Sequence, residues 1–297
     1  MAVQKRKKTM KAISRFFLVL LLVHVISAYP LSAATAPSPD NTTTVYTFGV
    51  VPQFEQRKLY AVWNPVITEL SRRTGLRFKL VTTLNIENFE KEFALGSFDF
   101  VYMNPYHVLK AKNYLPLVAD TAPLRGILVV RHDSPIKRLK ELEEKQVAFP
   151  SPNALGASLL MRADLDQLHH VKVKPLYVKT HSSVYLHVVK GLTVAGGGVE
   201  KSLAEQPPAI RSALRVIYTT RSMTSHPVSV HTRVMVADRK KVRQALLAMD
   251  TTAEGRGLLA KIPTTRLAPV SLADYEKMRA WGLESYWVDF WKEEGKR

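Results

Sequence analysis

The chain has 297 residues, with 43 lysines and arginines against 25 aspartates and glutamates, a formal net charge of +18, and no cysteine. The lack of cysteine excludes disulfides, thiol nucleophiles, zinc–thiolate sites, iron–sulfur clusters and a lipid-modified N-terminal cysteine. A content of 46% hydrophobic and 23% charged residues is typical of a globular protein, and the length suits one large domain or two ordinary ones.

The first 34 residues have the pattern of a secretory signal peptide. Six basic residues and no acidic residue stand before position 16, and the apolar run FFLVLLLVHVI follows at 16–26. A membrane anchor is the alternative, but this run is well short of the roughly 20 apolar residues that a spanning helix needs. Small residues at 32–34 fit a cleavage site, with Ala28 as an earlier option. We therefore expect export to the periplasm and loss of residues 1–34, which lowers the net charge to +12.

A polar tether is expected at residues 35–44, TAPSPDNTTT, ahead of a fold in which strands and helices alternate. Runs of β-branched and aromatic residues indicate the strands, and apolar residues spaced by three and four indicate the helices. In the first part, strands are expected at 45–51, 77–81 and 98–103, and helices at 59–73, 86–95 and 105–111. This alternation is typical of a mostly parallel sheet covered by helices.

The alternation continues through a second part and ends in a helical tail. Strands are expected at 126–130, 146–149, 173–178, 193–195, 214–218 and 228–231, and helices at 135–145, 156–168, 182–190, 239–249, 252–259 and 272–281. This order fits two α/β lobes joined by crossover strands, near 124–131 and 225–233. We expect lobe 1 at 45–125, lobe 2 at 126–228, and a return to lobe 1 with a helical C-terminal tail at 229–297. Ligands of such folds bind in the cleft beyond the carboxyl ends of the strands.

The stretch VAFPSPNALGAS at 147–158 is expected to form a strand, a loop and the start of a helix. Ser151 and Asn153 are candidate N-caps of that helix. Free backbone N–H groups at a helix start, with the positive end of the helix dipole, form an anion site that needs no lysine. An ordinary capped helix explains the same residues, so the local sequence leaves both interpretations open.

A second stretch, FDFVYMNPYH at 98–107, places polar side chains where a strand ends and a helix begins. The hydroxyls, amide and imidazole found here could together hydrogen-bond a polar ligand in a cleft; they belong to Tyr102, Asn104, Tyr106 and His107. Half-buried packing of the two tyrosines is the alternative.

Three more junctions carry candidate ligand contacts. His181 and Ser182 stand in the first turn of a helix, where a plain helix cap is the alternative. Three glycines at 196–198, just before Glu200, could let the backbone approach a ligand closely or adopt positive φ. His226 precedes a proline at the start of a strand.

Motifs for catalysis and cofactor binding are absent from the sequence. It contains no HExxH, GxSxG, protein-kinase, P-loop or EF-hand pattern. The adjacent His169 and His170 are not expected to bind a metal, because neighbouring residues on a helix point in different directions. We therefore expect no enzymatic activity, no metal and no cofactor.

From about Tyr46 to about Leu259, the sequence resembles the phosphate/phosphite/phosphonate-binding family of periplasmic solute-binding proteins, the type 2 "Venus flytrap" subunits of ABC importers. The resemblance rests on the order and spacing of WNP at 63–65 with TG at 74–75, GSFDFV at 96–101, GILVV at 126–130 before DSPI at 133–136, SPN at 151–153, TH at 180–181, RVIY at 215–218 and HP at 226–227. It implies a type 2 periplasmic-binding-protein fold, with two α/β lobes joined by crossover strands and a ligand cleft between them.

The resemblance also implies ligand-binding positions. Where family members carry Ser-Thr-Ser at a helix start, this chain has Ala154, Leu155 and Gly156, which keep the backbone donors and lose the hydroxyls. The family's histidine corresponds to His181, and its acidic residue in the later loop corresponds to Glu200.

One departure from the family concerns the ligand's amine. In phosphonate binders an acidic residue before the later proline holds that amine, and in this chain His226 stands there. An imidazole cannot accept an ammonium as a carboxylate does, so a small anion or another polar solute is favoured over an aminoalkylphosphonate.

The sequence thus predicts an exported, non-catalytic protein that closes its lobes on a small, anionic, phosphate-, phosphite- or phosphonate-like solute and delivers it to the membrane permease of an ABC importer. A ligand-sensing module for a membrane receptor kinase is the alternative, which the sequence does not separate. We expect a monomer, and no nucleic-acid binding because the remaining charge is spread without a basic run. The expected ligand-binding residues are Tyr102, Asn104, Tyr106, Ser151, Asn153, Ala154, Leu155, Gly156, His181, Ser182, Glu200 and His226.

Overall fold

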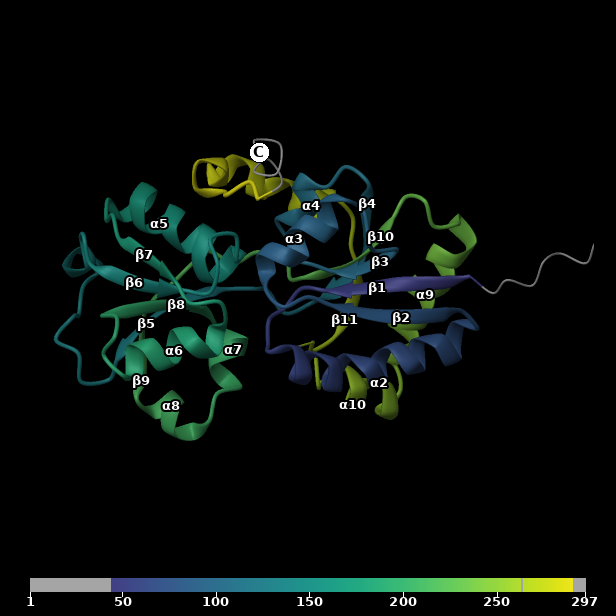
Figure 1. Cartoon of the computed structure of the whole chain (residues 1–297), viewed down its shortest axis with the longest axis horizontal. Helices are drawn as coiled ribbons and strands as arrows, with labels where there is room; N and C mark the ends of the chain where they lie inside the picture. The colour runs from purple at the N-terminus through teal and green to yellow at the C-terminus, as the bar shows by residue number, and fades with distance from the viewer. Residues whose placement is uncertain (1–43, 263, 291–297) are drawn as a thin grey trace, which may run out of the picture. The chain divides into compact units, whose positions relative to one another are not determined.

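The computed structural model describes residues 44–262 and 264–290. The expected signal peptide at 1–34, and all of the expected tether except Thr44, lie outside the described residues. The described chain folds into two α/β lobes, each built on one sheet (Figure 1). Within these residues, no helix combines the length and apolar character needed to cross a membrane.

Lobe 1 contains a six-stranded sheet in the order β11-β4-β10-β3-β1-β2. Its strands are β1 (Val45–Val50), β2 (Arg77–Thr82), β3 (Phe100–Tyr102), β4 (Tyr114–Asp120), β10 (Pro227–His231) and β11 (Leu267–Pro269). The first three strands are parallel to one another, whereas β10 is antiparallel to β3 and β4. The expectation of a mostly parallel sheet is therefore wrong, because a strand returning from the other lobe enters the middle of this one.

The helices of lobe 1 bury one apolar face against this sheet. They are α2 (Gln56–Thr74), α3 (Ile86–Ala94), α4 (His107–Lys110), α9 (Val236–Met249), α10 (Ala253–Leu259) and α11 (Ala273–Glu276). In α2 the buried residues recur at helical spacing, and Gly75 ends the helix with φ of 69°, a conformation that favours glycine. The ring of Trp63 on α2 packs 4.8 Å from that of Tyr102 at the end of β3. This contact fixes Tyr102 at the edge of the sheet that faces lobe 2.

Lobe 2 contains a five-stranded sheet in the order β7-β6-β8-β5-β9. Its strands are β5 (Gly126–Arg131), β6 (Gln146–Phe149), β7 (Lys174–Tyr177), β8 (Ala195–Val199) and β9 (Leu214–Thr219). Its helices are α5 (Leu160–His169), α6 (His181–Val189), α7 (Glu200–Ala204) and α8 (Pro208–Ser212). Helix α5 covers one face of the sheet, and α6 and α8 cover the other (Figure 1).

Several expected elements differ from those observed. The helix expected at 135–145 is only a short 3-10 turn at Leu139–Leu142, in a segment whose charged side chains pair locally. Strands β4 and β11 and helices α7 and α8 were not expected, because each is short or interrupted by proline or polar residues. The helix expected at 156–168 begins with a wide π turn at Leu155–Leu159 and continues as α5.

The three glycines at 196–198 belong to β8 and are buried, so they form neither a ligand-approaching loop nor a positive-φ turn. A Cβ on Gly197 would overlap the carbonyl oxygen of Ala157 and stand 2.6 Å from the Phe149 ring. A Cβ on Gly198 would overlap the hydroxyl of Tyr185. Glycine is required here because the start of the α5 helix and two aromatic rings pack directly on the strand.

Two short segments carry the chain between the lobes, at 121–125 and 220–226. They touch through paired hydrogen bonds between Leu124 and Met223, of 2.9 and 3.0 Å. These segments precede β5 and β10, which lie wholly in lobe 2 and lobe 1 respectively. The chain therefore passes from one sheet to the other a few residues before the expected crossovers. The expected boundary at residue 228 falls inside β10.

A third segment, near the C-terminus, contacts both lobes. In lobe 1, Glu284 accepts hydrogen bonds from the Tyr106 hydroxyl (2.6 Å) and from Lys110 (2.8 Å). In lobe 2, the Tyr286 hydroxyl donates to Asp166 (2.6 Å), and the Tyr286 carbonyl accepts from Arg162 (2.8 Å). Residues 284–286 therefore form a strap between the lobes, separate from the two crossover segments.

Candidate functional site

A cleft lies between the lobes, where the strands of each sheet end. It consists of two adjoining spaces that open to solvent. Both spaces are lined by Gln53, Leu124, His181, Val199 and His226, so they form one continuous site. Lobe 1 contributes residues that follow β1 and β3, and lobe 2 contributes residues that follow β6, β7 and β8. This is the position at which α/β sheets bind their ligands.

The start of the α5 helix forms one wall of the cleft through residues 154–157. The first hydrogen bonds inside this helix run from the N–H groups of Ser158 and Leu159 to the carbonyl of Ala154. The N–H groups of Leu155, Gly156 and Ala157 therefore have no acceptor within the helix. They stand at the positive end of the helix dipole, an arrangement that stabilises an anion.

Two histidines line the cleft with these backbone donors. His181 is the first residue of α6, behind the N-cap Thr180, and its Nδ1 lies 3.3 Å from the Ser202 hydroxyl. His226 lies in the second crossover segment, stacks on Tyr102 with 5.4 Å between ring centroids, and contacts Gln53 at 3.2 Å. Both rings are thus held in place before any ligand arrives.

Burial keeps both imidazoles neutral at pH 7. It lowers the pKa of His181 from 6.5 to about 4. It lowers the pKa of His226 to about 3, with a further contribution from the positive charge of Lys201. A bound anion would oppose both effects, because it favours the charged imidazolium.

The carboxyl groups beside the cleft are paired with lysines of the opposite lobe. Lys201 on α7 forms an ion pair with Asp120 at the end of β4, and Lys58 on α2 pairs with Glu205 at 3.1 Å. Burial alone would raise the pKa of Asp120, but hydrogen bonds from Lys201 and from backbone N–H groups hold it below the usual value. Among the described lining residues, no carboxylate is left without a cation, so the cleft suits an anion better than an ammonium.

The remaining wall of the cleft is apolar, unlike a cleft for a fully hydrated ion. Its apolar lining residues are Val51, Ile86, Leu124, Ala154, Leu155 and Val199. A ligand with a small apolar substituent could bury that group here.

The structure brings seven of the twelve expected residues to the cleft. These are Tyr102, Asn104, Ala154, Leu155, Gly156, His181 and His226. Their contact with a ligand stays a prediction.

The other five expected residues lie outside the cleft lining. The hydroxyl of Tyr106 is engaged by Glu284. Ser182 and Glu200 are exposed at the starts of α6 and α7. Ser151 is buried beside a separate opening, and its hydroxyl has no partner among the described residues.

Asn153, the fifth of these residues, belongs to a buried polar network between the lobes. Its side-chain amide donates to Glu90 at 2.7 Å, and its carbonyl accepts from Asn104 at 2.7 Å. Glu90 on α3 also contacts Nε2 of His107 at 2.9 Å. No side chain caps the α5 helix, so the expected N-cap roles of Ser151 and Asn153 are wrong, and Asn153 instead ties the helix start to lobe 1.

The cleft lining also includes residues that sequence reasoning missed, among them Gln53, Phe54, Lys201, Ser202 and Glu205. Gln53 and Phe54 follow β1 and could have been found from the rule that ligands bind beyond strand ends. The other three lie on or just after α7, a five-residue helix with too few turns to show a periodic pattern.

Comparison with known proteins gives a consistent result. The family model described as "ABC transporter, phosphonate, periplasmic substrate-binding protein" matches residues 48–275. No curated protein matches the sequence significantly.

Solved structures with the same fold come from several bacteria. A binding protein component of an ABC phosphonate transporter from Pseudomonas aeruginosa is 14% identical, with a TM-score of 0.72 over 80% of this chain and 85% of the other. PhnD1 from Prochlorococcus marinus in complex with methylphosphonate is 17% identical, with a TM-score of 0.73 over 82% and 99%. A Xanthomonas citri protein bound to chloride is 18% identical, with a TM-score of 0.66 over 82% and 98%. These matches confirm the expected two-lobed α/β fold.

Proposed function

The chain belongs to the family of periplasmic substrate-binding proteins of ABC phosphonate transporters, and from this premise we propose that it binds a small oxyanion in its cleft and delivers it to the permease of an ABC importer. The family consists of solute-binding proteins, and we propose no catalytic step. Export through the N-terminal signal peptide is part of the proposal.

One observation carries this function: backbone donors and neutral imidazoles line the same cleft. The N–H groups of Leu155, Gly156 and Ala157 supply fixed donors from lobe 2. His181 and His226 each offer a ring nitrogen that donates or accepts according to its tautomer. A tetrahedral oxyanion has acceptors on several sides, so donors from several elements can hold it at once.

The ligand we propose is a phosphonate or related oxyanion without an amino group. Its charged end would lie at the helix start, and a small apolar substituent would lie against Ile86 and Leu155. PhnD1, which shares this fold, was solved with methylphosphonate, a ligand of that kind. An ammonium would find Glu205 already occupied by Lys58.

Closure of the lobes on the ligand is part of the proposal. Two ion pairs, Lys58–Glu205 and Lys201–Asp120, each join an element of lobe 1 to α7 of lobe 2 or the residue just after it. A ligand that bridges the same lobes adds its own contacts to these pairs and shifts the population toward the closed form. The closed lobe pair is then the surface that a permease would recognise.

Titration calorimetry of the processed chain, residues 35–297, with phosphate, phosphite, methylphosphonate, 2-aminoethylphosphonate and sulfate tests the proposal. We expect methylphosphonate or phosphite to bind most tightly and 2-aminoethylphosphonate to gain nothing from its amine. Binding of none of these anions below millimolar concentration, together with tight binding of an uncharged solute, would contradict the oxyanion assignment.

We expect His181→Ala to weaken binding of the best anion by roughly ten- to a hundredfold, the loss of one hydrogen bond to a charged group. His187→Ala is the matched control, because His187 lies on the same helix and its imidazole bonds to the carbonyl of Ser183, away from the cleft lining. The control should bind within about twofold of the unchanged protein, while equal losses in both variants would mean that the helix, and not the imidazole, is responsible.

Binding should also tighten as the pH falls from 8 to 5. The free protein holds His181 and His226 with pKa values of about 4 and about 3, and a bound anion raises both. The complex therefore binds more protons than the free protein, and linkage requires affinity to increase at lower pH. Calorimetry in two buffers of different ionisation enthalpy measures the proton uptake directly, and proton release on binding would contradict the proposed contacts.

A further inference from the structure

The end of lobe 1 that lies away from the cleft carries an unusual surface. It is made by the start of β1, the loop after α3, and the loop that joins β10 to α9. Between residues 231 and 243 the chain has five basic residues and one acidic residue. The expectation that charge is spread without a basic run is therefore wrong for this segment.

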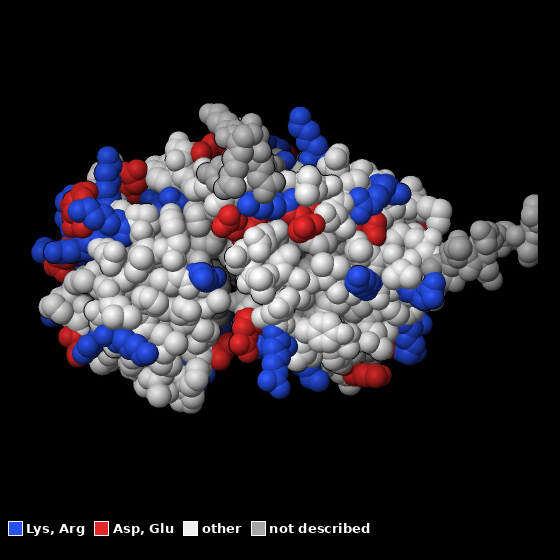
Figure 2. Space-filling view, viewed as in Figure 1, with Lys and Arg blue, Asp and Glu red and all other residues white. Residues whose placement is uncertain are grey.

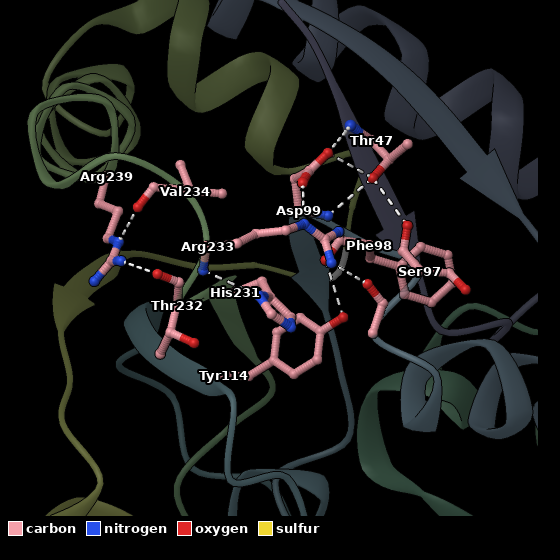
Figure 3. Close-up of polar contacts among 11 residues, drawn as sticks. Thr47, Ser97, Phe98, Asp99, Tyr114, His231, Thr232, Arg233, Val234 and Arg239 are labelled. Atoms are coloured by element: carbon pink, nitrogen blue, oxygen red, sulfur yellow. Dashed lines mark hydrogen bonds and ion pairs between the residues drawn. The ribbon is translucent and has the colours of Figure 1, made fainter.

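A network of hydrogen bonds holds these loops together, as Figure 3 shows. Asp99 accepts from the N–H and hydroxyl of Thr47 at 2.8 and 2.9 Å, and from Arg233 at 2.7 Å. Arg233 also donates to the carbonyl of Gly96, and Arg239 donates to the carbonyls of Thr232 and Val234. The surface is thus a fixed part of the fold.

Four apolar side chains project from this framework into solvent. Leu95 is 80% exposed, Met235 64%, Val236 59% and Val45 49%. Hydrogen bonds of their neighbours place them at the same end, because Leu95 adjoins Gly96, which bonds to Arg233, and Val45 adjoins Tyr46, which bonds to Asp238. We name Leu95, Val45, Met235 and Val236 the apolar tip.

Basic side chains surround the apolar tip and are only partly neutralised. Arg233 pairs with Asp99, and Lys241 with Asp238. The hydrogen bonds described for Arg239 go to carbonyl oxygens, which do not cancel its charge. Lys240 and Arg243 are exposed, one and two turns beyond Val236 on α9, and have no ion-pair partner among the described residues.

The far side of lobe 2 differs. Residues 133–145 carry four basic and four acidic side chains, several of them joined in local ion pairs. Figure 2 shows blue and red mixed over that end of the molecule, whereas blue predominates near the start of β1. The cluster of basic residues at 231–243 therefore has no counterpart at residues 133–145.

We propose that the apolar tip and the basic residues around it rest on the anionic lipid surface of the membrane. Protruding apolar side chains ringed by lysine and arginine match a surface that is negatively charged outside and apolar beneath. The chain also enters the fold here: only residues 27–43 separate Val45 and Thr44 from the apolar run at 16–26, a length that spans at most about 60 Å. Until residues 1–34 are removed, a signal peptide in the membrane would limit the distance of Thr44 from the lipid to that length.

Vesicle sedimentation of the processed chain, residues 35–297, tests the proposal without the signal peptide. This chain retains both sheets and every described core residue. We expect binding to vesicles of phosphatidylcholine with 30% phosphatidylglycerol, none to pure phosphatidylcholine, and loss of binding in high salt. The double variant Lys240→Glu/Arg243→Glu should lower the partition coefficient about thirtyfold, roughly fivefold for each basic residue removed from an anionic surface.

The matched control is Lys137→Glu/Lys145→Glu, which changes the net charge equally on the far side of lobe 2 and should bind like the unchanged protein. Leu95→Ser/Met235→Ser should weaken binding about tenfold or more through loss of buried apolar groups. Equal losses in both charge-reversed variants would overturn the proposal in favour of general charge attraction. Binding to native membranes but not to protein-free vesicles would overturn it in favour of a protein partner. Anion binding in the cleft should be unchanged in all of these variants. Failure of the membrane-surface proposal can therefore be distinguished from failure of the proposed transport function.

Discussion

Replacing Glu90 with alanine is expected to destabilise the protein by about 3–5 kcal/mol, the range seen when one partner of a buried polar pair is removed. Glu90 and His107 are fully buried, and the Nδ1 atom of His107 already has no hydrogen-bond partner within residues 44–262 and 264–290. Without the carboxyl group, both ring nitrogens of His107 would lack hydrogen-bond partners, and a cavity would remain where the Glu90 side chain packs beside α3. Urea unfolding of the ligand-free protein measures the loss.

The control for this prediction is Glu92→Ala, on the same helix and exposed, which should change stability by less than about 0.5 kcal/mol. Glu90→Gln keeps the shape and should recover part of the loss, because its amide oxygen can still accept from Asn153. A stability change below 1 kcal/mol in Glu90→Ala, with an unchanged m-value, would mean that water replaces the carboxyl group and that the network is not a closed unit.

Replacing Gly197 with alanine is expected to cost about 3 kcal/mol and to abolish ligand binding at the same time. The added methyl group would overlap the carbonyl oxygen of Ala157, so the start of the α5 helix must move away from β8. That helix start carries the N–H donors proposed to hold the anion. Stability and ligand affinity should therefore fall together, as measured by unfolding and calorimetry on the same preparation.

Gly257→Ala is the control for a glycine with open space around it. No atom of the described residues lies within 4 Å of the position that a Cβ would take, and Gly257 is an exposed residue in the interior of α10. Alanine there should stabilise the helix by about 0.5–1 kcal/mol and leave binding unchanged. If Gly197→Ala binds the anion normally despite lower stability, the helix start is not the anion site.

Local patterns predicted most of the regular elements, since α2, β1 and β5 are long enough to show periodicity or a continuous apolar run. The lobe order also followed from the sequence, because each lobe repeats the same alternation of strands and helices. Short elements such as α7 could not be predicted, since five residues complete barely one turn. The role of Gly197 was also missed, because the Ala157 carbonyl that forbids a side chain there lies on another element.

The candidate site could also be predicted only in part, because local patterns show where strands end but do not show contacts between distant elements. Residues near strand ends, such as Tyr102 at the end of β3 and His181 at the start of α6, could be placed at the cleft from the order of elements alone. The burial of Asn153 in a network outside the cleft lining could not be predicted, because its partner Glu90 lies 63 positions earlier on a helix of the other lobe. The lysines that form ion pairs with Asp120 and Glu205 could not be predicted either, since ion pairs between lobes leave no local pattern in the sequence.

The strap at residues 284–286 has a consequence for how long a ligand stays bound. The two crossover segments lie together and can serve as an axis for rotation, but Glu284 and Tyr286 hold different lobes at a point away from that axis. Rotation that separates the lobes must first break one of these hydrogen bonds. The residence time of the ligand would then depend on the release of the strap as well as on the ligand's own contacts, so substitution of Tyr286 could speed dissociation without altering any group in the cleft.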